Sequence, residues 1–201
     1  MLYSKGKGKS KGFTIIEMVI SIAIFAFMTA FLIAKYGSFN QSVLLTNLAY
    51  DIALTLRNAQ SYGLNVKSKP TSTENYSESF NYAYGVHFDS SSTENKKMIF
   101  FADIDNDTLY DSGEEILPIY NLKRGFYISN ICIGHPQYFC QYSGIVKIDI
   151  TFKRPNPNAI IKDNVVATLY KYADITIKSS TDSTASKKIK ITDLGQISVI
   201  K

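Results

Sequence analysis

The longest apolar run of the chain lies at residues 13–34 and reads FTIIEMVISIAIFAFMTAFLIA. It contains one charged residue, Glu17, and no proline. At 1.5 Å per residue, a helix of this length spans about 33 Å, which is enough to cross a bilayer core of about 30 Å. The run therefore predicts one membrane-spanning helix near the start of the chain.

Three interpretations of this helix compete. A plain membrane anchor accounts for most of its residues. A secretory signal peptide needs a shorter apolar run and a small-residue cleavage site, for which Ala30 and Ala34 are weak candidates. The third interpretation rests on Glu17, because a carboxylate inside a membrane helix costs about 2.5–3.5 kcal/mol and usually marks function. A cationic partner would account for this residue.

A short basic leader precedes the run, since residues 1–12 read MLYSKGKGKSKG. Together with the following segment, Phe13-Thr14-Ile15-Ile16-Glu17, it resembles the processing site of type IV pilins and pseudopilins. The resemblance implies that a prepilin peptidase cleaves between Gly12 and Phe13 and then methylates the new amino terminus of Phe13. It further implies a structural subunit, a minor pilin or pseudopilin, that joins other subunits at an inner-membrane assembly platform.

Electrostatics agrees with this resemblance. Cleavage creates an α-amino group at Phe13, which is cationic at neutral pH. If Glu17 of one subunit meets the Phe13 amine of the next, each charge offsets the cost of burying the other. Removing one partner of such a buried pair costs roughly 3–5 kcal/mol. Glu17 is therefore the predicted assembly residue.

The rival hypothesis is a membrane-anchored binding protein that does not polymerise and that contacts calcium or DNA.

The net charge of +5 belongs mostly to the leader. Without its four lysines, Lys+Arg falls from 22 to 18 against 17 Asp+Glu, which leaves +1. Lysines before a membrane helix favour the cytoplasmic side, so the rest of the chain is expected outside. A mild basic bias at the C-terminal end indicates a solvated face, with nucleic-acid contact as the less favoured alternative. It comes from Lys187, Lys188, Lys190 and Lys201.

The helix is expected to continue to Tyr62, because apolar residues recur at three- and four-residue spacing and Gly63 suits a helix end. These residues are Val43, Leu44, Leu48, Ile52, Leu56 and Ala59. Residues 65–79 form a predicted loop. Strand-like runs then follow without intervening helices: Phe80–Phe88, Lys97–Ala102, Ile116–Asn121, Phe126–Ile133, Ile145–Lys153, Val165–Ile177, Lys187–Thr192 and Gln196–Ile200.

These patterns predict an α+β fold of three parts: a cleaved leader at 1–12, a helix at 13–62 and a β-domain at 63–201. The helix is transmembrane in its first half, amphipathic in its second half, and packs on a largely antiparallel sheet. Parts of the domain resemble the H-type minor pseudopilin and T-type fimbrial minor pilin family. They are Tyr84–Phe88, similar to its early strand, Phe101–Glu115, similar to its aspartate-rich turn, and Lys190–Ile197, similar to its closing hairpin.

An acidic segment at residues 103–114 has the spacing of a twelve-residue calcium loop. The side-chain oxygens come from Asp103, Asp105, Asp107, Asp111 and Glu114, and the carbonyl of Leu109 occupies position 7. Thr108 stands where such loops normally have glycine. The flanking runs are strands, so an EF-hand domain is excluded. Calcium binding and a polar turn built from Asp and Asn both remain open, and the turn is favoured.

Cys132 and Cys140 are the only cysteines. An even count in an exported chain favours one disulfide over a zinc site that would include His135, because three ligands at this spacing match no common zinc pattern. His87 alternates with Val86 and Phe88 and is expected on the surface. The chain has no G-x-S-x-G, H-E-x-x-H or phosphate-binding glycine-rich motif, so no enzyme activity is predicted.

Overall fold

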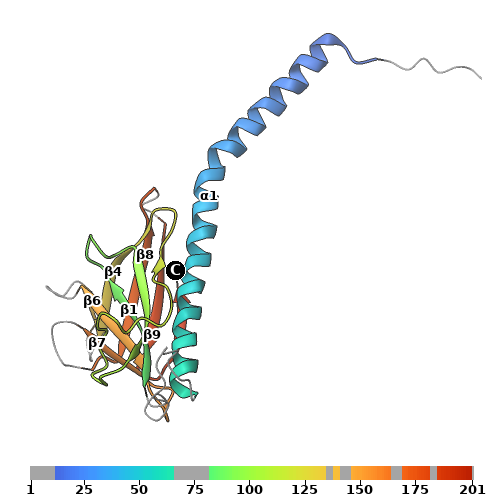
Figure 1. Cartoon of the computed structure of the whole chain (residues 1–201). Coiled ribbons are helices and arrows are strands. Elements are labelled where there is room, and N and C mark those ends of the chain that lie inside the picture. The colour runs from blue at the N-terminus through green and yellow to red at the C-terminus, as the bar shows by residue number, and fades with distance from the viewer. Residues whose placement is uncertain are drawn as a thin grey trace, which may run out of the picture. The chain divides into compact units, whose positions relative to one another are not determined.

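The computed structural model describes residues 12–65, 82–134, 138–140, 146–163, 169–181 and 185–200. The leader up to residue 11 and most of the predicted loop at 65–79 lie outside these ranges. The chain divides into two compact units, Met1–Asn40 and Gln41–Lys201. One helix, α1 (Ile15–Leu64), contributes to both (Figure 1).

The part of α1 within the first unit is apolar on all sides, and it carries its large side chains on the surface. An apolar window of this helix is long enough to cross a membrane and is 0% buried. Exposed residues include Ile15, Ile16, Ile20, Phe25 and Phe31. Its sequence contains no proline and no glycine before Gly37, so nothing interrupts the helix. The predicted transmembrane half therefore forms a helix whose surface is suited to lipid or to other apolar helices.

The part of α1 within the second unit has one buried stripe. Leu48, Ile52, Leu56 and Ala59 are buried, as their spacing predicts. Val43 was expected in this stripe but is 41% exposed, and Leu45 is buried instead. Position 45 lies on the face of positions 49, 52 and 56, whereas position 43 points away from it.

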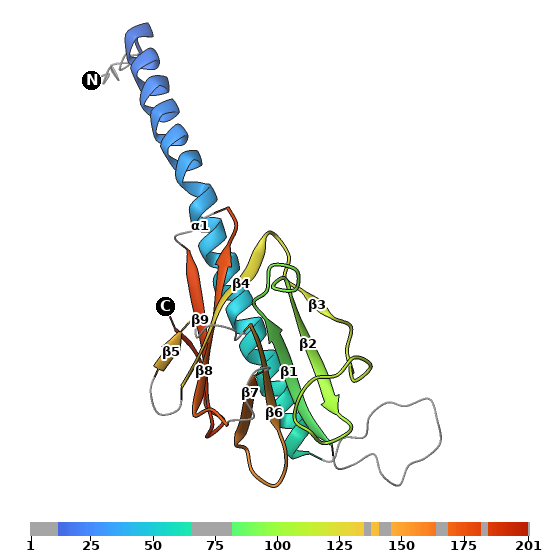
Figure 2. The same cartoon turned by 90° about the vertical axis from the view of Figure 1, so that its left-hand side faces the viewer.

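Two antiparallel five-stranded sheets complete the second unit (Figure 2). Sheet A has the order β3 (Tyr120–Asn121), β2 (Lys97–Asp103), β1 (Ala83–Asp89), β6 (Lys147–Phe152) and β7 (Ala159–Asp163). Sheet B has the order β10 (Ile197–Ile200), β9 (Ser186–Thr192), β8 (Tyr172–Ser179), β4 (Phe126–Gly134) and β5 (Tyr138–Cys140). Every pairing within the described strands is antiparallel, which confirms the α+β prediction.

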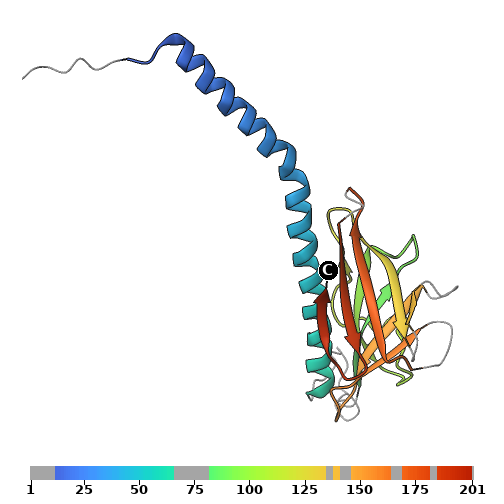
Figure 3. The same cartoon turned by 180° about the vertical axis from the view of Figure 1, so that it is seen from behind.

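The core lies where the inner faces of both sheets meet the buried stripe of α1. Sheet A contributes Val86, Phe88 and Ile150, and sheet B contributes Ile175 and Ile189, all fully buried. The edge strand β10 runs beside this part of the helix (Figure 3). Because the helix covers the core, its second half belongs structurally to the β-domain.

The helix ends at Leu64, two residues beyond the predicted end, and Gly63 lies inside it. A Cβ atom at Gly63 would lie 2.3 Å from the carbonyl oxygen of Phe152. Glycine is therefore required here because the helix approaches β6 closely, and not because the helix stops.

Strand positions agree with the predictions where the apolar alternation is regular, as in β1, β2, β4 and β9. The predicted strand Ile116–Asn121 shortens to Tyr120–Asn121. The strand predicted at Val165–Ile177 begins at Tyr172, and residues 164–168 lie outside the described ranges. Strands β5 and β7 were not predicted.

Candidate assembly and metal sites

The predicted cleavage segment precedes α1. Gly12, Phe13 and Thr14 are exposed and non-helical, and the helix begins at Ile15. The backbone N–H of Glu17 donates a hydrogen bond to the Thr14 hydroxyl oxygen at 3.3 Å. The N–H of Met18 donates to the Thr14 carbonyl at 3.1 Å. Thr14 is therefore the N-cap of α1.

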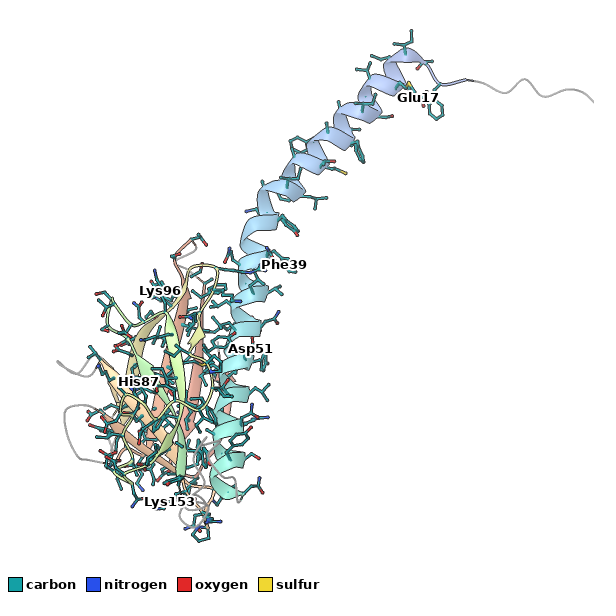
Figure 4. All side chains as sticks on the ribbon, in the orientation of Figure 1. Glu17, Phe39, Asp51, His87, Lys96 and Lys153 are labelled. Carbon is teal, nitrogen blue, oxygen red and sulfur yellow. The ribbon has the colours of Figure 1, made fainter. Side chains whose placement is uncertain are left out.

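Glu17 lies in the first turn of α1 and is exposed (Figure 4). A carboxylate at this end of a helix interacts favourably with the helix dipole. Its side chain forms no hydrogen bond or ion pair with the residues that the structure describes. Its carboxylate is thus accessible to a cation of another chain, and it is the one charged group of the apolar run at 13–34.

The acidic segment at residues 103–114, called the acidic loop below, wraps around the side chain of Asp103. This side chain is 0% exposed. Its two carboxylate oxygens accept hydrogen bonds from the N–H groups of Asp107 and Thr108, both at 3.1 Å. The Glu114 carboxylate accepts from the N–H of Ile104 at 2.7 Å and of Asp111 at 3.1 Å. The ends of the predicted twelve-residue loop are therefore held together by its first and last carboxylates.

Two groups of carboxylates in this loop lie close enough to share a cation. Oxygens of Asp103, Asp105 and Glu114 lie within 4.8 Å of one another, and so do those of Asp105, Asp107 and Asp111. These are the five residues predicted from the spacing. Thr108 adopts a φ of 69°, the left-handed conformation for which calcium loops use glycine. The threonine therefore does not prevent the turn.

Burial is the main cause that raises the pKa of the Asp103 carboxyl from 3.8 to about 6, and the charges of Glu114 and Asp107 add to it. Hydrogen bonds from the Thr108 and Asn106 backbone oppose this rise. The site thus disfavours a full set of negative charges unless a cation is bound.

The acidic loop also covers the outer face of sheet A. The ring of Tyr110 lies 5.5 Å from that of Phe101 and 4.9 Å from that of His87. Lys162 donates a hydrogen bond from its ammonium group to the Asp107 carbonyl at 2.7 Å, and Lys153 donates to Asn106. Figure 4 shows Lys153 and His87 on this domain. The strand β1 is therefore covered on one face by the core and on the other by this loop.

His87 is buried, which corrects the expectation that it lies on the surface. Its Nδ1 lies 2.7 Å from Oδ1 of Asp149, the residue directly opposite on β6. The pair borders a cavity of about 300 Å³ beneath the acidic loop. Alternation along β1 placed His87 on the outer face correctly, but it gave no sign that a loop covers that face.

Cys132 on β4 and Cys140 on β5 are direct cross-strand partners in backbone register. Opposite residues of antiparallel strands have Cβ atoms about 4.5–5.5 Å apart, close to the spacing of a disulfide. The backbone register is compatible with a disulfide, which stays a prediction. His135, the alternative zinc ligand, lies outside the described residues.

The lysines of β9 contact their own sheet. The Lys188 ammonium lies 3.7 Å from an oxygen of Asp174, and that of Lys190 lies 5.0 Å from the ring centre of Tyr172. Lys187 is half-buried, and Lys201 lies outside the described ranges. These contacts favour a solvated face over a nucleic-acid surface.

Sequence reasoning overlooked two features of these sites. The spacing Thr14-x-x-Glu17 is that of a capping box, and it could have located the helix start. No sequence pattern indicates the His87–Asp149 pair, because its residues lie 62 positions apart and meet only through strand pairing.

Comparison with known proteins gives one match. The family model described as the prokaryotic N-terminal methylation motif matches residues 7–33. No curated protein and no solved structure matches the chain. The match indicates a type IV pilin-like precursor with a prepilin leader and an apolar N-terminal helix, and it points to a structural subunit rather than an enzyme. It fits a protein anchored in the inner membrane, processed by prepilin peptidase and assembled with other pilin subunits.

Proposed function

We propose that this chain is a minor subunit of a type IV pilus or of a type II secretion pseudopilus, related to the H-type and T-type minor subunits. The observation that carries the proposal is the methylation motif at residues 7–33, set on a helix whose apolar window is 0% buried. Such a surface requires lipid before assembly and neighbouring helices afterwards.

Processing prepares the subunit for assembly. Prepilin peptidase hydrolyses the Gly12–Phe13 bond with one water molecule, which leaves a carboxylate on Gly12 and an ammonium group on Phe13. A methyl donor then transfers its methyl group to the new amino group, which loses a proton as the C–N bond forms. The lysines of the leader hold the N-terminus in the cytoplasm, so the β-domain lies outside the membrane.

Assembly then pairs charges between subunits. When the apolar helix leaves the lipid and enters a helical bundle, the Glu17 carboxylate meets the Phe13 amine of a neighbour. In apolar surroundings neither charge is stable alone, so the pair selects one axial register between subunits. The accessible Glu17 side chain supports this step.

Replacing Glu17 tests the assembly step. We expect Glu17→Ala and the isosteric Glu17→Gln to be cleaved normally, but to enter filaments at least about tenfold less than the wild type, since breaking a buried ion pair costs several kcal/mol. The measurements are the N-terminal mass of the membrane-bound protein and its amount in sheared filaments. A matched control is Asp51→Ala, which also removes an exposed acidic side chain, from the second half of the same helix. Normal incorporation of Glu17→Gln would refute the charge pairing.

The mature N-terminus separates this function from the alternative of a non-polymerising anchored binding protein. A chain that starts at methylated Phe13 supports the pilin-like subunit. A chain that retains Met1 supports the alternative, in which the acidic loop or the basic end holds a ligand.

Calcium binding at Asp103, Asp105, Asp107, Asp111 and Glu114 is a further proposal, supported by the grouping of their oxygens. Titration calorimetry of the protein in detergent should show one bound Ca²⁺ per chain, and Asp105→Asn should abolish it because Asp105 belongs to both carboxylate groups. If no heat of binding is measured at millimolar calcium, the loop acts only as a structural turn.

The disulfide between Cys132 and Cys140 is a separate proposal. It is supported by their register on neighbouring strands, and non-reducing electrophoresis tests it.

A further inference from the structure

We propose that Thr14 is a positioning residue for leader cleavage: its side chain caps α1 and keeps the Gly12–Phe13 bond outside the helix. This inference rests on the proposed processing of the chain. It concerns the residue that follows Phe13, whose side chain is neither part of the cleaved bond nor one of the two charged groups.

The cap is visible in two hydrogen bonds. The Thr14 hydroxyl accepts from the N–H of Glu17, and its carbonyl accepts from the N–H of Met18. An N-cap residue has a non-helical backbone itself, so the helix begins one residue later, at Ile15. The cleaved bond is then separated from the helix by Phe13 and Thr14.

Without this cap the helix has no other reason to begin at Ile15. Residues 12–16 contain no proline, and Gly12 is itself an acceptable N-cap. With alanine at position 14, the best helix former, the helix can extend back to Phe13. The Gly12–Phe13 bond would then be the first peptide unit of the helix.

A helical bond is a poor substrate for a peptidase. Peptides commonly bind their receptors as extended strands, through main-chain hydrogen bonds that a helix already uses internally. A bond inside the first turn must therefore unwind before water can be added across it. The cap removes this step by holding the segment open in the precursor.

Glu17 serves two purposes through different groups. Its backbone N–H completes the cap, and its carboxylate is accessible to a neighbour. Substitutions of the Glu17 side chain retain the backbone N–H, so they preserve the bond to Thr14. Processing can therefore depend on Thr14 and assembly on the Glu17 carboxylate, although the two residues belong to the same turn.

The test compares three variants of the full-length precursor in membranes that contain prepilin peptidase. Thr14→Ala removes the cap, Thr14→Ser keeps it with a similar side chain, and Thr14→Asn keeps it with a different one. An N-cap is worth about 1 kcal/mol, which corresponds to about fivefold. We expect Thr14→Ala to lower the kcat/KM of cleavage about fivefold, and the other two to stay within about twofold of the wild type.

Amide hydrogen exchange of the uncleaved precursor provides a second readout. Slower exchange at residue 16 in Thr14→Ala would show that the helix has extended back to Phe13, because the N–H of residue 16 then gains the Gly12 carbonyl as its helical acceptor. Wild-type cleavage of Thr14→Ala would overturn the inference. So would slow cleavage of Thr14→Asn, because the peptidase would then recognise the hydroxyl directly. If the wild-type chain itself is not cut after Gly12, the proposed processing fails, whatever the exchange data show about the cap.

Discussion

At the scale of single residues, two carboxylates occupy positions that cost free energy. Glu17 is the one charged residue of the apolar run at 13–34, on an exposed helix, and Asp103 is fully buried among other acidic groups. We propose that each is stabilised by a cation from outside the chain, an amino terminus for Glu17 and a metal ion for Asp103. Under this proposal each residue links the folded chain to a partner.

Asp103 should give the protein a measurable dependence of stability on pH in the absence of calcium. Its pKa is raised to about 6 in the folded state, so its protonated form is favoured by folding. The resulting stability is complete below pH 3.8 and is lost as the pH rises through about 6. Between these limits we expect the unfolding free energy to fall by about 1–3 kcal/mol more in the wild type than in Asp103→Asn.

Urea unfolding in EDTA at about pH 4 and about pH 7, on either side of the Asp103 titration, measures this difference. Other carboxylates titrate over the same range, so the comparison with Asp103→Asn isolates the contribution of this one group. Equal pH dependence in the two proteins would contradict the burial argument. Added calcium should oppose the loss at neutral pH, because a cation favours the charged form.

At the scale of elements, α1 combines two kinds of surface. Its first part is apolar on all sides, whereas its second part buries one stripe against the sheets. The two glycines of the helix reflect this difference. A Cβ atom added at Gly37 would have nothing within 4 Å, whereas one added at Gly63 would meet the backbone of Phe152 at 2.3 Å.

We predict opposite effects of alanine at these two glycines. Gly63→Ala should destabilise the β-domain by about 1–3 kcal/mol, because the helix must move away from β6. Gly37→Ala should be neutral or should stabilise the helix by up to about 1 kcal/mol, since alanine is the better helix former. Chemical denaturation followed by tyrosine fluorescence measures both. A similar cost at the two positions would contradict the close approach at Gly63.

The elements themselves were largely predictable from the sequence. The apolar run at 13–34 and the spacing of Leu48, Ile52 and Leu56 predict the helix, because a single periodicity persists over many turns. Alternation likewise predicts β1 and β9. The short strand β7 was missed because two prolines precede it at 155 and 157 and it is only five residues long. A strand of this kind is specified by its pairing with β6.

The candidate sites were predictable where they are local in sequence. The grouping of Asp103, Asp105 and Glu114 follows from loop spacing alone. The His87–Asp149 pair was not predictable, because it depends on the register of β1 against β6. The packing of Tyr110 on His87 depends in addition on how the loop folds over the sheet. Such contacts between distant segments leave no pattern in a single sequence.

At the scale of the whole molecule, the two compact units have different requirements. The second unit, Gln41–Lys201, contains every residue of the hydrophobic core found in the described ranges, from Leu45 to Ile191. The described residues of the first unit contribute none of them, and their apolar side chains are exposed. Folding of the β-domain should therefore not depend on the membrane segment, whereas assembly should depend on it entirely.

A chain truncated to Gln41–Lys201 should accordingly be soluble without detergent, monomeric and folded. We expect its thermal midpoint to lie within about 5 °C of that of the full-length protein, because a change of about 1 kcal/mol shifts the midpoint of a domain of this size by about 2–4 °C and no core contact is removed. Circular dichroism and light scattering measure the midpoint and the mass. As a control, truncation to residues 54–201 removes Leu45, Leu48 and Ile52 from the core and should prevent folding. An aggregated or unfolded product from residue 41 would show that the first unit stabilises the domain, which would contradict the division of roles along α1.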